Sequence, residues 1–226
     1  MMRTRTPADV AGKAAQRGSA SRAAIGFSVK SGWAAAVLVS GTLKSPHVID
    51  SRRIELSDPS VPDSRQPYHA GFGTARASGP GLTNLVAGVR RFGKQSVSAI
   101  IDQYRTAGHD LVGAGIVVGS LIDPERIANA HIQIHAREGQ LFRGVVEDAA
   151  RAVSLSCSVW RERDLYSTAA GTLNHPEESL RSTVKSLRKD VPGRWRSEQQ
   201  AATVAAWLML IASARDVTAP RRVKRT

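Results

Sequence analysis

The sequence holds a single cysteine, Cys157, among 226 residues. This excludes an intrachain disulfide and a cysteine-based zinc site. The apolar stretch around it, residues 155–160, predicts a buried structural thiol rather than a nucleophile. No apolar run reaches the roughly 18 residues of a membrane-spanning helix, and the N-terminus lacks the apolar core of a secretory signal. We therefore expect a soluble cytoplasmic protein without a membrane partner; no pattern indicates an oligomeric state.

Acidic residues are also scarce. The chain has 19 Asp and Glu against 32 Lys and Arg, which gives a net charge of +13. Residues 1–22 contribute +4 and residues 216–226 contribute +3, so the middle of the chain retains +6. A basic chain attracts polyanions by releasing their counterions, so DNA or RNA is a candidate partner. The alternative is a solvated, arginine-rich chain that binds nothing specific.

Composition along the chain divides it into three parts. Residues 1–22 lack apolar periodicity and predict a disordered basic arm, and residues 214–226 predict a basic tail. Residues 23–213 form the predicted domain, whose hydrophobic content is ordinary for a globular protein. Within it, residues 57–82 are rich in proline and glycine, which indicates a long loop of the kind that is often functional.

Apolar patterning in the domain predicts a mixed α/β fold. The Lys30-Ser31-Gly32 segment between two apolar runs indicates a hairpin, and the nearly unbroken apolar run 111–118 is typical of a parallel strand covered on both faces. Residues 197–212 are apolar almost all round, which predicts a buried helix. Strands are expected at residues 23–29, 33–39, 47–56, 111–118 and 155–160, and helices at residues 83–107, 127–153, 164–171, 177–189 and 197–212.

This order resembles the ribonuclease H-like fold, and especially its RuvC-type Holliday-junction resolvase branch. The resemblance rests on residues 25–33 (IGFSVKSGW), on residues 111–118 and on the closing helix 197–210, and it covers residues 23–213. It implies a five-stranded mixed sheet, with a three-stranded antiparallel meander and two parallel strands, flanked by helices. The chain is also similar to a set of uncharacterised bacterial proteins, which supplies no function.

The resemblance also implies where catalytic acids would lie. Resolvases of this branch hold two metal ions with carboxylates on the first strand, at the end of the fourth strand and at the start of the final helix. The matching positions here hold Ser28, Val118-Gly119-Ser120, Glu198, Ala201 and Ala202. Asp123 and Glu198 remain as candidate catalytic acids. Because two acids do not make a two-metal clamp, we expect a degenerate site, and the Gly113-x-Gly115 pair indicates close packing rather than a nucleotide loop.

One group of titratable residues has the spacing of a metal site. His131, His135 and Glu138 stand at i, i+4 and i+7 of the second predicted helix, so they share the face that should point inward. Two histidines at i, i+4 with a carboxylate suit a divalent metal. A hydrogen-bonded structural cluster, or an exposed helix start, explains the same spacing.

A basic segment with one aromatic residue precedes the final helix: Arg188, Lys189, Arg194, Trp195 and Arg196. Phosphate contacts with base stacking on the indole would fit it, as would a tryptophan that tethers a loop. Our leading hypothesis is therefore a non-catalytic nucleic-acid-binding module. The alternatives are a metal-dependent nuclease or phosphodiesterase that uses His131, His135, Glu138 and Asp123, and a protein-interaction scaffold.

Overall fold

The computed structural model describes residues 21–71 and 74–218, with side chains as far as Ala214. Most of the predicted basic arm and the end of the predicted tail lie outside the described residues. The first strand begins at Ser21, two residues before the predicted domain boundary, and the last helix continues into the predicted tail as far as Thr218.

Five strands form one mixed sheet, as predicted. They are β1 (Ser21–Lys30), β2 (Trp33–Gly41), β3 (Pro46–Glu55), β4 (His109–Val118) and β5 (Cys157–Arg161). Their order across the sheet is β3-β2-β1-β4-β5. The first three strands are antiparallel neighbours, whereas β1 pairs with β4, and β4 with β5, in parallel. Cys157 opens β5 and is half-buried, so the prediction of a buried thiol was wrong in degree, because only one side of this edge strand is covered by a neighbour.

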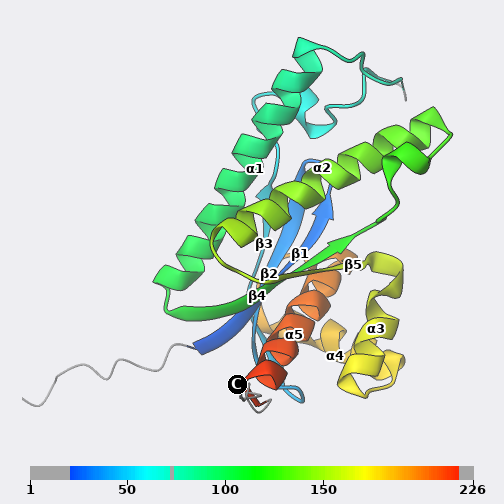
Figure 1. The fold of residues 1–226 in the computed structure, drawn as a ribbon. Helices are drawn as coiled ribbons and strands as arrows, with labels where there is room; N and C mark the ends of the chain where they lie inside the picture. The colour runs from blue at the N-terminus through cyan, green and yellow to red at the C-terminus, as the bar shows by residue number, and fades with distance from the viewer. Residues whose placement is uncertain (1–20, 72–73, 219–226) are drawn as a thin grey trace, which may run out of the picture.

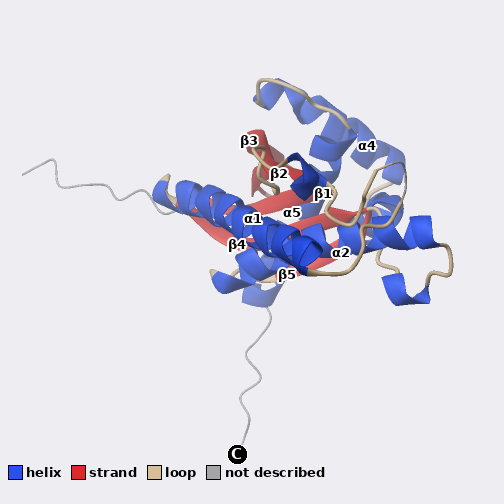
Figure 2. Cartoon of the chain, turned by 90° about the horizontal axis from the view of Figure 1, so that it is seen from above, coloured by secondary structure: helices blue, strands red, loops and turns tan. Residues whose placement is uncertain are grey.

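Helices cover both faces of the sheet (Figures 1 and 2). They are α1 (Pro80–Thr106), α2 (Ala130–Ala152), α3 (Leu165–Leu173), α4 (Glu177–Ser186) and α5 (Ser197–Thr218), with short 3-10 turns η2 (Pro62–Arg65), η3 (Pro124–Arg126), η4 (Glu162–Asp164) and η5 (Leu187–Asp190). α2 begins three residues later than predicted, because Ile127 is extended and the Asn129 side chain caps the helix by accepting a hydrogen bond from the Ile132 backbone N–H. No helix in the described ranges is both long and apolar enough to cross a membrane.

The alternation of β1 divides the core into two layers. Ile25 and Phe27 face α1 and α2, whereas Ala24 on the other side packs against α5. Residues 23–29 are all buried, as expected for a central strand covered on both faces. α5 is buried from Ala201 to Ile211. This confirms the prediction that a helix with apolar residues on all sides is buried.

Glycines on two strands let α5 approach the sheet closely. A Cβ on Gly26 would overlap the Ala202 carbonyl, and one on Gly115 would lie 2.5 Å from the Ala205 carbonyl oxygen. The Gly113-x-Gly115 pair is therefore a packing feature, as predicted. Gly113 faces Met209, so α5 runs antiparallel to β4, and its N-terminus lies towards the carboxyl ends of β1 and β4.

Candidate functional site

The positions that match the resolvase acids meet at this end of the sheet without forming an acidic cluster. Ser28 is 1% exposed and its Oγ has no hydrogen-bond partner. It pairs with Ala35 on one side and Val117 on the other, so its surroundings are apolar. Ala201 and Ala202 are buried in the same layer. A metal cation here would meet one hydroxyl instead of paired carboxylates.

Neither candidate acid forms a hydrogen bond with the Ser28 hydroxyl in the described structure. Asp123 is exposed, and its Oδ1 accepts a hydrogen bond of 3.1 Å from the Glu125 backbone N–H at the start of η3. Glu198 is half-buried in the first turn of α5, where one carboxylate oxygen lies 3.3 Å from the Ser197 hydroxyl. Within the described residues, neither acid belongs to a group of three side chains placed to hold a metal ion.

A cleft of about 410 Å³ opens beside the N-terminus of α5 instead. Its lining includes five arginines and one acid: Arg52, Arg53, Arg65, Arg194, Arg196 and Glu198. The Arg52 guanidinium itself donates to Gln103 of α1, on the other face of the sheet. Trp33 and Ser51 contribute from the adjacent strands. The Arg196 backbone N–H donates to the Gln199 side chain at 2.9 Å, and the Arg196 carbonyl accepts from the Gln200 backbone N–H. α5 therefore starts at the wall of this cleft.

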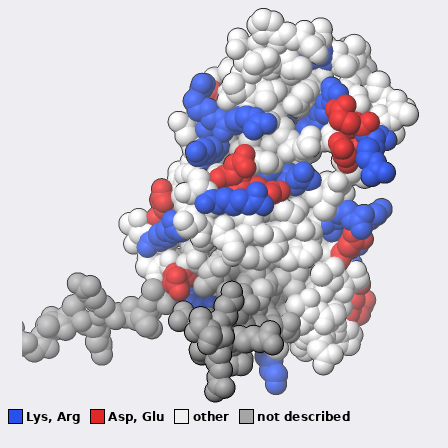
Figure 3. Space-filling model, in the orientation of Figure 1, with Lys and Arg blue, Asp and Glu red and all other residues white. Residues whose placement is uncertain are grey.

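Three of these arginines form no ion pair with a carboxylate among the described residues. Arg53 pairs with Glu55 at 2.6 Å and stacks over the Trp33 ring, 4.2 Å from its centroid, and Arg52 pairs with Asp50. In the part of the chain that the structure describes, no salt bridge engages Arg65, Arg194 or Arg196. The cleft therefore carries a net positive charge. On the face drawn in Figure 3, by contrast, basic and acidic side chains are interspersed.

The predicted basic segment is only partly gathered at the cleft. Arg194 and Arg196 line it, whereas Arg188 and Lys189 are exposed on η5 and do not. Trp195 is half-buried against α5, and its indole N–H donates to the Val184 carbonyl at 3.1 Å. This placement favours the tethering tryptophan over a platform for base stacking.

A second group of functional side chains lies on the α1–α2 side of the sheet. His131 and His135 are brought together as predicted, with their Nε2 atoms 3.2 Å apart. His69, from the loop between β3 and α1, joins them; the ligand atoms of the three histidines all lie within 4.8 Å of one another. His69 lies 4.8 Å from His135 and 6.2 Å from His131, measured between ring centroids.

Glu138 has a different role from the predicted one. It is fully buried and its Oε1 lies 2.8 Å from Nδ1 of His69, so it holds a histidine instead of joining His131 and His135. Burial raises the pKa of Glu138, and the hydrogen bond and charge of His69 oppose that rise. Partial desolvation lowers the pKa of His135, and the nearby His69 and His131 lower it further.

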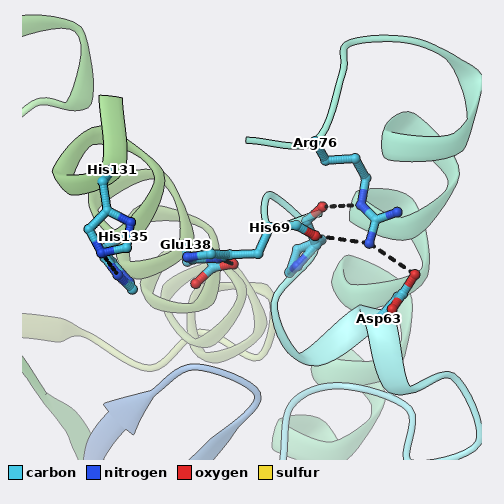
Figure 4. Close-up of polar contacts among 7 residues, drawn as sticks. Asp63, His69, Arg76, His131, His135 and Glu138 are labelled. Atoms are coloured by element: carbon cyan, nitrogen blue, oxygen red, sulfur yellow. Dashed lines mark hydrogen bonds and ion pairs between the residues drawn. The ribbon is translucent and has the colours of Figure 1, made fainter. Parts of the chain in front are cut away.

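An arginine clamp places His69 in this cluster (Figure 4). Arg76 donates to the backbone carbonyls of Pro67 and His69 and to the Asp63 carboxylate, each at 2.9 Å. A short bridge between His69 and Ala75 closes the same hairpin-like turn. The loop is thus internally bonded, although its sequence predicts only an irregular segment.

The prediction that His131 and His135 point inward was wrong. Both are exposed, and of the three predicted residues only Glu138 is buried. The three share a helix face, but the first turns of α2 extend beyond the strand ends, whereas Glu138 lies one to two turns further along, where the loop and α1 cover the helix (Figure 1). His69 was missed, because no periodicity connects a loop residue to a helix more than 60 positions away.

Comparison with solved structures identifies the fold. Thermus thermophilus RuvC matches with 11% identity and a TM-score of 0.50, over 86% of this chain and 96% of that chain. The same protein in complex with Holliday junction substrate matches with 10% identity and a TM-score of 0.51, over 87% and 96%. The yeast mitochondrial Holliday junction resolvase Ydc2 matches at 7% identity with a TM-score of 0.48, over 88% and 83%. Neither a protein-family model nor a curated protein matches the chain. The protein thus has the ribonuclease H-like fold in the arrangement of the RuvC resolvases.

Proposed function

We propose that this protein is a cytoplasmic nucleic-acid-binding module that holds a phosphodiester backbone in the arginine-lined cleft without cleaving it. The observation that carries the proposal is the lining of that cleft, in which Arg53, Arg65, Arg194 and Arg196 accompany one glutamate. The arm and residues 216–226 of the tail, with net charges of +4 and +3, would add attraction for a polyanion.

The cleft has the chemistry that phosphate groups require. Guanidinium groups bind phosphate oxygens through two parallel hydrogen bonds. The first turn of α5 lines the same cleft, and the N-terminus of a helix adds unpaired N–H groups and a partial positive charge. Arg65, Arg194 and Arg196 lack carboxylate partners among the described residues, so a phosphate would not have to displace an existing ion pair.

The acid positions support binding without hydrolysis. Two-metal cleavage needs clustered carboxylates that hold both ions against the attacking and leaving oxygens. Ser28, Ala201 and Ala202 stand where the fold's acids would be, and Glu198 remains alone at the start of α5. The likeness to RuvC in complex with Holliday junction substrate supports DNA as the polyanion and makes a four-way junction the first probe.

Fluorescence anisotropy with a labelled four-way junction and a matched duplex tests the proposal. We expect affinity to fall steeply between about 50 and 200 mM salt. The double variant Arg194→Ala/Arg196→Ala should weaken binding by at least about tenfold and reduce the slope of log K against log salt by about 2, one unit per lost phosphate contact.

The matched control is Arg188→Ala/Lys189→Ala, which removes the same charge from neighbouring exposed positions outside the cleft. An equal loss in both double variants would mean general charge attraction and would refute a role for the cleft. Incubation of the same substrates with Mg²⁺, Mn²⁺ or Zn²⁺ should leave the strands intact. Cleavage that is lost on His135→Ala would contradict the proposal and favour the metal-dependent phosphodiesterase.

A further inference from the structure

We propose that His69, His131 and His135 bind one Zn²⁺ ion, and that Glu138 is the positioning residue that orients His69 for it. This inference goes beyond the proposed function, because it uses none of the residues that line the arginine cleft. It rests on the geometry of the three imidazoles, on the contact that supports one of them, and on the buried charge beside them.

The first support is the distance between the ligand atoms. Zinc bound tetrahedrally by imidazole nitrogens at about 2.0–2.1 Å places those nitrogens about 3.3 Å apart. The Nε2 atoms of His131 and His135 already lie 3.2 Å apart, one helical turn from each other on α2. The third ligand atom lies within 4.8 Å of both, so a shift of about 1.5 Å by His69 would complete the set.

The second support is the contact of Glu138 with His69. Histidines that bind metals almost always donate their other ring N–H to a carboxylate or carbonyl, which fixes the tautomer and the ring orientation. Glu138 lies 2.8 Å from Nδ1 of His69 and is fully buried, while the His69 side chain is only 11% exposed. The contact directs Nε2 of His69, rather than Nδ1, towards a metal.

The third support is the charge balance of the cluster. A buried carboxylate is stabilised by a positive charge close to it, and Oε2 of Glu138 has no hydrogen-bond partner within the described structure. A divalent cation held by the three imidazoles would supply that charge beside His69, which Glu138 contacts.

Three protein ligands leave the fourth zinc position open. His131 and His135 are exposed, and His135 also lines a cleft of about 330 Å³ that includes Lys30 and Ser120. A water molecule or a donor from a ligand in that cleft would complete the coordination. The ion would also connect the loop before α1 to α2, because His69 belongs to the loop and the other two ligands belong to the helix.

Isothermal titration of the untagged, chelator-treated full chain with Zn²⁺ alone tests the proposal. We expect one ion per chain with a dissociation constant below about 1 μM, and a rise in the melting temperature with zinc. His135→Ala and His69→Ala should each weaken binding by more than about 100-fold, and Glu138→Gln by about 10- to 100-fold. With Co²⁺ in place of zinc, the wild-type chain should show the visible absorption bands of a tetrahedral site.

The matched control is His175→Ala, which removes an exposed histidine from the turn between α3 and α4. The chain has six histidines, three of them in the cluster, and a single cysteine, so few other groups compete for zinc. The control should bind as the wild type does. Equal losses in His135→Ala and His175→Ala, or no binding at about 100 μM zinc, would overturn the proposal.

If Glu138→Gln binds zinc as tightly as the wild type, the positioning role of Glu138 is overturned. Circular dichroism without metal shows whether each variant is folded. His135 is exposed, so His135→Ala remains an informative variant even if the buried Glu138 substitution unfolds the chain. Because the histidine variants leave the arginine cleft intact, loss of zinc and loss of DNA binding are distinguishable.

Discussion

The substitution Gly26→Ala tests the close packing of α5 against the sheet. The new Cβ would overlap the carbonyl of Ala202, a backbone group that cannot rotate aside, so α5 would have to move away from β1. Overpacking of this kind costs about 1–3 kcal/mol, and a backbone obstacle favours the upper end. Alanine also restricts the unfolded chain, which returns about 0.4–1 kcal/mol. We therefore expect a net loss of about 2 kcal/mol in the free energy of unfolding.

Urea denaturation followed by tryptophan fluorescence measures this loss, and the melting temperature should fall by about 4–8 °C. The matched control is Gly144→Ala in α2, where a Cβ would meet no atom within 4 Å. A helix gains about 0.8–1 kcal/mol from this exchange, so the control should be slightly more stable than the wild type. A Gly26→Ala protein as stable as that control would refute the packing argument.

Three further predictions concern other side chains. Tyr104→Phe should reduce stability by about 1.5 kcal/mol in thermal unfolding, because the Tyr104 hydroxyl donates to the Asp50 carboxylate at 2.7 Å; no change would mean that water replaces the bond. Burial raises the pKa of the Cys157 thiol, so less thiolate exists at neutral pH. The thiol should therefore react with a disulfide reagent more slowly than free cysteine, and the rate should rise at higher pH. A faster reaction than that of free cysteine would contradict the half-buried position of Cys157. Trp195→Phe should lower the free energy of unfolding in urea by about 1 kcal/mol, because the Val184 carbonyl loses its donor, and it should leave DNA affinity unchanged. A large loss of DNA affinity would instead support stacking of a base on the Trp195 ring.

Local patterns were sufficient to predict the order of strands and helices, because the central elements are strongly patterned, and the resemblance of that order to the ribonuclease H-like fold implied the mixed sheet. The continuous apolar run 111–118 and the helix 197–212, which is apolar all round, are each expected to be buried on all sides. They form β4 and α5, which are buried in this way. The edge elements were predicted less well. The start of α2 differs from the prediction because Ile127 is extended and the Asn129 side chain caps the helix at the Ile132 N–H, a local preference that apolar periodicity does not detect.

The candidate sites could be predicted only in part, because each combines residues from distant segments. The i, i+4 spacing of His131 and His135 is visible in the sequence, but the approach of His69 depends on the Arg76 clamp. Arg194 and Arg196 were singled out as a basic segment, whereas the arginines of β3 and η2 were not. Arg53 alternates with the apolar Ile54 along β3 and pairs with Ala35, and this alternation is the signal that could have placed it on the face opposite to Ile54.

Side-chain NMR of the arginines during titration with duplex or junction DNA tests the central claim most directly. If the cleft binds the phosphate backbone, the Nε–H signals of Arg65, Arg194 and Arg196 should shift together and saturate at the same DNA concentration, while Arg188 outside the cleft changes little. Shifts confined to arginines elsewhere, with the cleft signals unmoved at saturation, would contradict the account.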